Sequence, residues 1–226
     1  MGGKNLLKES KAYYDDNFYY EIFSKAEDSR CEIANYFTNV INGGVVLDAG
    51  CGTGKYTKLL ENISDKYIGI DLSGKQLDVA IKKSEKETTE FIKANLANIP
   101  LKNNSVDVII CTWVLGTIID LEERKKCIDE FRRVLKKDGR IILVENACGG
   151  EFEWIRERLN DNRTNDYNKW LLKMGFKEKK KFSSYFLFES TEVARKCFEI
   201  IYGQEKAKKI NREIIGHEIL IFELKT

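Results

Sequence analysis

The sequence has little proline, histidine or methionine: its 226 residues include one proline, one histidine and two methionines. The single Pro100 excludes a proline-rich linker between domains. The single His217 leaves one imidazole for any metal, and the cysteines form no close pairs, so we expect no metal site and thiols that stay reduced in a reducing compartment. The six cysteines are Cys31, Cys51, Cys111, Cys127, Cys148 and Cys197.

A strong charge of one sign and a long hydrophobic run are also missing. Lysine and arginine number 38 against 36 aspartates and glutamates, a net charge of +2. Proteins that neutralise many phosphates are usually more basic, so we expect no nucleic-acid partner. The longest largely apolar run, residues 108–119, is 12 residues long, whereas a bilayer span needs about 20. Because the N-terminus also lacks an apolar signal core, we expect a cytoplasmic protein without a membrane partner.

Hydrophobic periodicity predicts alternating strands and helices. A helix should start near Thr53, a second is capped by Ser73 and buries Ile81, and a third is capped by Asp120 and ends at Gly139. Later in the chain, a helix is expected over residues 190–202. Strands are expected at residues 45–47, 67–71, 90–93, 106–111, 140–145, 182–188 and 214–224.

This alternation predicts the α/β class: a doubly wound, Rossmann-like seven-stranded sheet, mostly parallel with an antiparallel last strand, and with helices on both faces. We expect a single domain overall, because the length allows one core with additions. Within it, residues 1–44 form an N-terminal helical cap and residues 45–147 the core. Residues 148–226 supply a helical segment on the substrate side and the strands that complete the same sheet.

Three glycines follow the first predicted strand. Gly50, Gly52 and Gly54 allow a sharp turn and let a ligand lie against the main chain, because no Cβ intervenes. Asp71 follows Gly50 by 21 positions at the end of the second strand, where a carboxylate can accept hydrogen bonds from a ribose diol. The loop and the acid together predict an adenosine-containing ligand. A dinucleotide fingerprint would place its third glycine where this chain has Lys55, which argues against a nicotinamide cofactor.

Several ordered segments resemble the class I S-adenosylmethionine-dependent methyltransferases, specifically the type 11 small-molecule enzymes. The third of them has Asn95 where that family commonly has aspartate. The segments are VVLDAGCGTG at residues 45–54, IGIDLS at 68–73, FIKANL at 91–96 followed by IPL at 99–101, VDVIIC at 106–111 and RVLKKDGRIIL at 133–143.

The resemblance implies S-adenosylmethionine as cofactor, S-adenosylhomocysteine as product, and no metal. Asp48 would orient the methionine end, Asp71 would hold the ribose, and Asn95 would accept a hydrogen bond from the adenine amine. Tyr14 would belong to an aromatic lid over the cofactor, and Cys51 is not expected to act as a nucleophile. The full implied cofactor set is Tyr14, Asp48, Ala49, Gly50, Cys51, Gly52, Gly54, Asp71, Leu72, Asn95, Leu96, Cys111 and Thr112.

The resemblance further implies methyl transfer to a small-molecule acceptor by in-line displacement, in a monomer or homodimer. Trp113, Glu145 and Asn146 are the residues expected near the acceptor, and His217 is expected to be a hydrogen-bonded structural residue. No catalytic base can be assigned from the sequence. Two alternatives stay open: an RNA or protein methyltransferase, supported only by the lysines at 177, 179, 180 and 181, and a non-catalytic S-adenosylmethionine-binding protein.

Overall fold

A computed structural model describes residues 17–225 of the chain. The described residues form two compact units, which we treat separately. Unit 1 contains residues 34–144 and 223–225, and unit 2 contains residues 17–33 and 145–222. The strands form a seven-stranded mixed sheet in the order β3-β2-β1-β4-β5-β7-β6, mostly parallel with antiparallel last strands, as predicted. Within residues 17–225, no helix has both the length and the apolar character needed to span a membrane.

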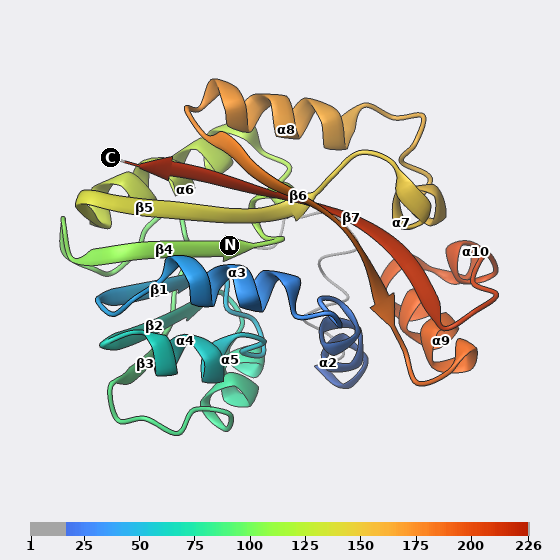
Figure 1. Ribbon diagram of the computed structural model, residues 1–226, viewed down its shortest axis with the longest axis horizontal. Coiled ribbons are helices and arrows are strands. Elements are labelled where there is room, and N and C mark those ends of the chain that lie inside the picture. The colour runs from blue at the N-terminus through green and yellow to red at the C-terminus, as the bar shows by residue number, and fades with distance from the viewer. Residues whose placement is uncertain (1–16, 226) are drawn as a thin grey trace. The chain divides into compact units, whose positions relative to one another are not determined.

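Unit 1 is built on five parallel strands, seen side by side in Figure 1. They are β1 (Val45–Ala49), β2 (Lys66–Asp71), β3 (Thr89–Lys93), β4 (Val106–Thr112) and the first part of β5 (Leu135–Asn146). The central strands are almost entirely apolar, because helices cover both of their faces. The register places Asp48 of β1 opposite Gly69 of β2 and Ile110 of β4, so the carboxyl ends of β1, β2 and β4 meet at one edge.

The helices of unit 1 cover the sheet on both faces. Figure 1 shows α3 and α4 in front of the strands and α6 behind them. Ser73 caps α5 by accepting a hydrogen bond from Gln76 N, and Asp120 caps α6 by accepting one from Glu123 N, as the sequence predicted. The elements are α3 (Glu32–Val40), α4 (Thr57–Ile63), α5 (Gly74–Ile81), the short 3-10 helix η1 (Leu115–Thr117) and α6 (Leu121–Val134).

Three local predictions were wrong. Helix α4 begins at Thr57 instead of Thr53, because residues 51–56 continue the glycine turn. Helix α6 ends at Val134, and Gly139 lies inside β5, where the register shifts against β4 and a Cβ would come within 2.9 Å of Asp107 O. Ile81, expected in the core, ends α5 with 52% of its surface exposed.

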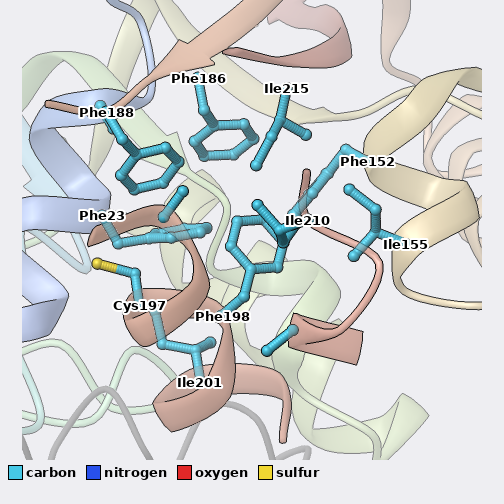
Figure 2. Packing of buried hydrophobic residues seen from close by; sticks show 13 residues of the cluster. Phe23, Phe152, Ile155, Phe186, Phe188, Cys197, Phe198, Ile201, Ile210 and Ile215 are labelled. Atoms are coloured by element: carbon cyan, nitrogen blue, oxygen red, sulfur yellow. The ribbon is translucent and has the colours of Figure 1, made fainter. Parts of the chain in front are cut away.

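Unit 2 has its own core of aromatic side chains, shown in Figure 2. The ring of Phe23 lies 4.9 Å from that of Phe186 and 5.8 Å from that of Phe198, and all three side chains are buried. Gly203 ends the helix over residues 191–202 with a φ of +91°. The elements are α2 (Asn17–Ala26), α7 (Gly150–Ile155), α8 (Arg163–Lys173), β6 (Lys177–Leu187), α9 (Thr191–Tyr202), α10 (Gln204–Ala207) and β7 (Ile214–Lys225), which passes into unit 1 at its end.

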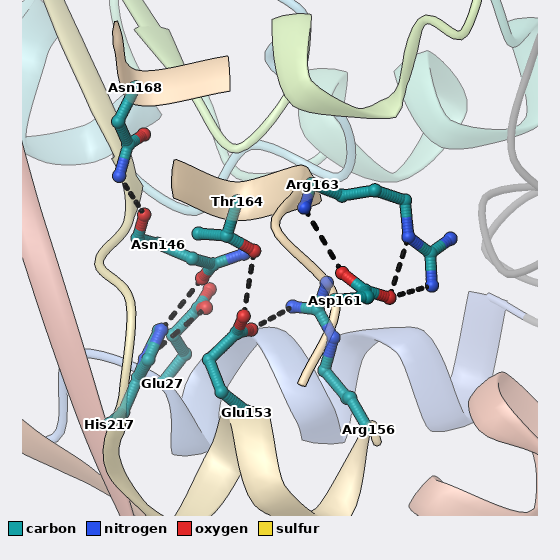
Figure 3. A network of polar contacts seen from close by, with 9 residues as sticks. All are labelled: Glu27, Asn146, Glu153, Arg156, Asp161, Arg163, Thr164, Asn168 and His217. Atoms are coloured by element: carbon teal, nitrogen blue, oxygen red, sulfur yellow. Dashed lines mark hydrogen bonds and ion pairs between the residues drawn. The ribbon is translucent and has the colours of Figure 1, made fainter. Parts of the chain in front are cut away.

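Figure 3 shows several groups of polar contacts in unit 2, most of them between buried side chains. Nε2 of His217 lies 2.8 Å from Oδ1 of Asn146, and its Nδ1 lies 3.8 Å from Oε1 of Glu27. The ring of His217 stacks on that of Phe186 at 4.8 Å. His217 is 2% exposed, so the prediction of a hydrogen-bonded structural histidine is confirmed.

Candidate cofactor site

The glycine loop that leaves β1 takes a conformation that ordinary side chains avoid. The φ angles of Gly50, Gly52 and Gly54 are +86°, +56° and +77°. The amides of Gly50 and Cys51 both donate to Ile70 O, at 2.7 and 3.0 Å, which ties the loop to the end of β2. A Cβ on Gly50 would lie 2.4 Å from Cγ2 of Val114. The loop therefore requires glycine at position 50 for its backbone angle and for space.

Gly54 serves a different contact. A Cβ at this position would lie 2.7 Å from Oγ1 of Thr57 and 3.0 Å from Cβ of Ala80. Because Ala80 lies on α5, the missing side chain lets the loop approach that helix closely. The glycine loop is thus held between the end of β2 and α5.

Asp71 ends β2 and joins the loop through hydrogen bonds. Its Oδ2 accepts from Gly52 N at 3.0 Å, and its Oδ1 accepts from Ser73 N at 2.8 Å. The side chain is buried, and this burial raises the pKa of the carboxyl group in spite of the backbone donors. The Leu72 backbone also donates to this carboxyl group. An ionised carboxylate offers about four acceptor positions, so acceptor capacity remains for a further donor such as a ribose hydroxyl.

Asp48 is a second buried carboxyl group on the same face of the sheet. Tyr67 donates its hydroxyl proton to Oδ2 of Asp48 at 3.0 Å, and Oγ1 of Thr57 lies 3.1 Å from the Tyr67 oxygen. Burial raises the pKa of Asp48 to about 7, the Tyr67 hydrogen bond lowers it, and the charge of Asp71 raises it further. Unit 1 therefore holds two acids within mutual electrostatic reach at the edge where its strands end.

The alternation of β2 places these groups together. Tyr67, Gly69 and Asp71 occupy alternate positions and share one face of the strand. A Cβ on Gly69 would lie 2.8 Å from the ring of Phe91 and 3.0 Å from Sγ of Cys51. Without that Cβ, the thiol of Cys51 fits beside the strand at Gly69.

The thiol of Cys51 is a poor nucleophile in this position. Its side chain is buried, and burial, together with the charges of Asp48 and Asp71, raises its pKa well above the usual range. The thiol therefore stays protonated at neutral pH. This state agrees with the expectation that Cys51 is no nucleophile.

The segment after β3 contains the residues expected near adenine. Oδ1 of Asn95 accepts from Ala97 N at 2.9 Å, and its Nδ2 donates to Oε1 of Glu123 at 3.4 Å. These bonds fix the amide orientation and leave one lone pair of Oδ1 for another donor. Leu96 is buried and Leu72 is half-buried.

The remaining cofactor residues of the predicted set lie at the ends of β1 and β4. Ala49 and Cys111 are buried, and Thr112, which ends β4, is half-buried. Tyr14 lies outside the described residues.

The residues expected near an acceptor are divided between the units. In unit 1, Trp113 directly follows β4 with a φ of +54°, and Nζ of Lys55 lies 4.7 Å from the centre of its ring. In unit 2, Glu145 accepts a hydrogen bond from the Tyr167 hydroxyl at 2.6 Å. Asn146 contacts His217 through its side chain and accepts from Nδ2 of Asn168 at 3.1 Å through its carbonyl oxygen.

Sequence reasoning missed the hydroxyl pair that supports Asp48. Tyr67 was assigned to a strand and Thr57 to a helix, without a role for either. The signal that could have found Tyr67 is the alternation of β2, because Tyr67 lies on the same face as Asp71, four positions before it. No sequence pattern pairs Thr57 with Tyr67, since their contact depends on where α4 begins.

A parallel sheet with a glycine loop after β1 and a buried acid ending β2 is the arrangement of a Rossmann-like nucleotide-binding domain. Comparison with known proteins defines the class further. Residues 47–143 match the family described as "Methyltransferase domain". Within these residues the chain resembles a methyltransferase domain, and this similarity supports the class I S-adenosylmethionine-dependent type.

Curated relatives are similar to this chain in sequence, and a solved structure is similar to it in fold. The chain is 35% identical over 107 residues to the ubiquinone/menaquinone biosynthesis C-methyltransferase UbiE of Campylobacter jejuni, which covers 44% of this chain and 43% of the relative. It is 33% identical over 120 residues to the tRNA (carboxymethyluridine(34)-5-O)-methyltransferase of Arabidopsis thaliana, which covers 53% of this chain and 28% of the relative. The chain thus spans less than half the length of these two curated relatives. The YcgJ protein of Bacillus subtilis has a similar fold, with a TM-score of 0.65, 16% identity, and coverage of 85% of this chain and 97% of that one.

Proposed function

We propose that this protein transfers a methyl group from S-adenosylmethionine to a small-molecule acceptor and releases S-adenosylhomocysteine. The observation that carries the proposal is the pair of buried acids, Asp48 and Asp71, beside the glycine loop of a methyltransferase domain. A negative charge on one of these acids disfavours ionisation of the other. A positively charged ligand relieves this repulsion, so the site favours such a ligand. S-adenosylmethionine brings a sulfonium and an ammonium group, together with a ribose diol.

The residues of the site fit this cofactor. Oδ1 of Asp48 has no hydrogen-bond partner in the described part of the chain although it is buried, so it can accept a bond from a ligand ammonium group. Asp71 keeps acceptor capacity for the ribose, and the amides of the glycine loop lie beside it. Asn95 would meet the adenine amine. When bound, the cofactor supplies an electrophilic methyl group on its sulfonium sulfur.

Four further residues are proposed to contact the cofactor. Leu72 would pack on the adenine, and the amide of Leu96 would face one of its ring nitrogens. Cys111 and Thr112, where β4 ends, would pass beneath the sulfur. The protein would position an acceptor atom in line with the methyl group and exclude water, which are the main requirements when the leaving group is already activated.

The acceptor is proposed to be a small molecule with Trp113, Glu145 and Asn146 among the residues that select it. Glu145 is buried and accepts a hydrogen bond from the Tyr167 hydroxyl, and no residue is assigned as the catalytic base. The Campylobacter relative carries the name of a C-methyltransferase of quinone biosynthesis, which is consistent with a small acceptor.

An RNA acceptor is the second candidate, because β6 exposes four lysines in five positions and one relative carries the name of a tRNA methyltransferase. Local contacts occupy part of this run. Nζ of Lys181 lies 3.3 Å from Oε2 of Glu218, and Nζ of Lys180 lies 4.6 Å from the centre of the Phe182 ring. Binding of a tRNA transcript that weakens steeply as salt rises, and that is lost in a Lys177→Ala, Lys179→Ala double variant, would favour this candidate.

Calorimetric titration with S-adenosylhomocysteine tests the cofactor. We expect Asp71→Ala to weaken binding by about tenfold to a hundredfold, since hydrogen bonds to a charged group contribute about 1.5–3 kcal/mol. The exposed Asp78 on α5 supplies the matched control, Asp78→Ala, which should bind normally. Absence of binding by the folded protein, or equal binding by Asp71→Ala, would overturn the proposal. Transfer of labelled methyl from S-adenosylmethionine into a metabolite extract tests the reaction itself.

A further inference from the structure

Asp48 is the end of a chain of three buried side chains in unit 1. Oγ1 of Thr57, Oη of Tyr67 and Oδ2 of Asp48 follow one another at 3.1 and 3.0 Å. The exposed fractions of Thr57, Tyr67 and Asp48 are 0%, 0% and 2%, so water does not compete for these bonds. Each hydroxyl carries one proton, so when Asp48 is ionised Tyr67 donates to it and Thr57 donates to Tyr67.

The same chain can satisfy the other protonation state. If Asp48 carries a proton on Oδ2, it donates to Tyr67, and Tyr67 in turn donates to Thr57. Reversal of two hydroxyl protons is enough, and no heavy atom has to move. The hydroxyl chain therefore keeps both of its hydrogen bonds whether Asp48 is neutral or ionised.

Acidic groups surround Asp48. Among residues 17–225, no lysine, arginine or histidine is among the groups that shift its pKa. The titratable groups that act on it are Tyr67 and Asp71 on β2, and the thiol of Cys51 lies beside it in the loop. The stretch of β4 that pairs with β1 is apolar: Val108, Ile109 and Ile110. Burial raises the pKa of Asp48 to about 7 and the charge of Asp71 adds to this rise, whereas the Tyr67 hydrogen bond lowers the pKa.

We propose that binding of the cofactor's ammonium group expels a proton from Asp48, and that Tyr67 and Thr57 are the positioning residues which set how readily that proton is held. The proposal rests on the proposed function, because it assigns the proton linkage of the same cofactor site. A cation beside the unpartnered Oδ1 favours the carboxylate, so the ligand and the proton compete for Asp48. The site then binds its cofactor more tightly as the pH rises towards 8.

The direction and the size of the pH effect on affinity follow from the linkage between ligand binding and protonation of Asp48. With a pKa of about 7 in the free protein and a lower pKa in the complex, the affinity falls as the pH drops below 7. The dissociation constant of S-adenosylhomocysteine should be about tenfold higher at pH 6 than at pH 8. At pH 7 about half of the molecules carry the proton, so binding should release about half a proton.

Calorimetry in buffers with different ionisation enthalpies measures the dissociation constant and the number of protons released, and it does not rely on turnover. 5′-Methylthioadenosine is the control ligand, because it keeps the adenosine portion and lacks the amino acid. Its affinity should not change between pH 6 and pH 8. If it releases the same proton as S-adenosylhomocysteine, the linkage belongs to Asp71 at the ribose and the proposal fails.

Three variants identify the group responsible. Asp48→Asn should remove proton release and the pH dependence. Tyr67→Phe removes a hydrogen bond that lowers the pKa of Asp48, so the midpoint of the affinity curve should move to higher pH. Thr57→Val should move it in the same direction by less, because Tyr67 then becomes a weaker donor. Tyr36→Phe is the matched control: Tyr36 also donates to a carboxylate of unit 1, Oε1 of Glu223 at 2.8 Å, and its loss should leave the curve unchanged.

The outcomes separate this proposal from the function on which it rests. If neither nucleoside binds to the folded protein, the proposed function fails. If S-adenosylhomocysteine binds with the same affinity at pH 6 and pH 8 and releases no proton, the cofactor assignment stands and the proton linkage is wrong. If Tyr67→Phe does not fold, Thr57→Val and Asp48→Asn still decide the question.

Discussion

The closest contact of the glycine loop leads to a quantitative prediction. Gly50→Ala places a Cβ at a φ of +86° and within 2.4 Å of Cγ2 of Val114. The backbone angle costs about 1–2 kcal/mol for an L-residue. Overpacking against Val114 adds about 1–3 kcal/mol. We therefore expect the free energy of unfolding to fall by about 2–5 kcal/mol.

A double-mutant cycle separates these two costs. Val114→Ala removes the methyl groups that the new Cβ would strike, so Gly50→Ala in that background should cost only the backbone part, about 1–2 kcal/mol. Gly203→Ala is the matched control for the angle, since Gly203 has a φ of +91° and nothing within 4 Å of its added Cβ. Urea unfolding followed by circular dichroism measures each value. A loss below about 0.5 kcal/mol for Gly50→Ala, or no coupling to Val114, would refute the reasoning.

Three further predictions concern packing and charge. Glu130→Gln should flatten the acid limb of the stability curve: the Arg133 hydrogen bonds lower the pKa of Glu130 from 4.5, so its contribution is present above that value and is lost as the pH falls through the lower folded value. Urea titrations from pH 6 to pH 3 test this, and parallel curves for both proteins would contradict it. Phe23→Ala should cost about 3–5 kcal/mol, because the ring is buried in the aromatic core of unit 2, whereas Phe18→Ala, with 68% of Phe18 exposed, should change the unfolding free energy by less than about 0.5 kcal/mol. Equal thermal midpoints for the two variants would be inconsistent with that core. Tyr167→Phe should cost about 1–3 kcal/mol through the lost bond to the buried Glu145, as measured by chemical unfolding, and an unchanged value would show that the bond contributes nothing to stability.

The sequence predicted the strands and caps of unit 1 well because their signals are local. Apolar runs at β1 and β4 predict strands covered on both faces, and Ser73 and Asp120 mark helix starts by their own side chains. The errors occur where contacts between distant elements decide. Helix α4 starts late because the glycine turn, which is tied to the end of β2, continues through residue 56, and the extension of β5 through Gly139 depends on its register with β4.

The candidate site was predictable only in part for the same reason. The motif identifies Asp48, the glycines and Asp71 through their spacing, and the structure joins Gly52 to Asp71 by a hydrogen bond. It does not indicate that Tyr67 donates to Asp48, because that bond crosses from one strand to its neighbour and needs the register of β1 with β2. The bond between Tyr167 and Glu145 joins residues 22 positions apart, and no motif specifies it.

The thiol of Cys51 is enclosed beside Gly69, so its chemical modification reports how often the glycine loop opens. Alkylating reagents should reach the exposed Cys31 and Cys148 without any opening of the fold, but they can reach Cys51 only when the turn lifts away from β2. The modification rate of Cys51 therefore counts the excursions of the turn. A nucleoside that holds the turn in place should lengthen the interval between those excursions.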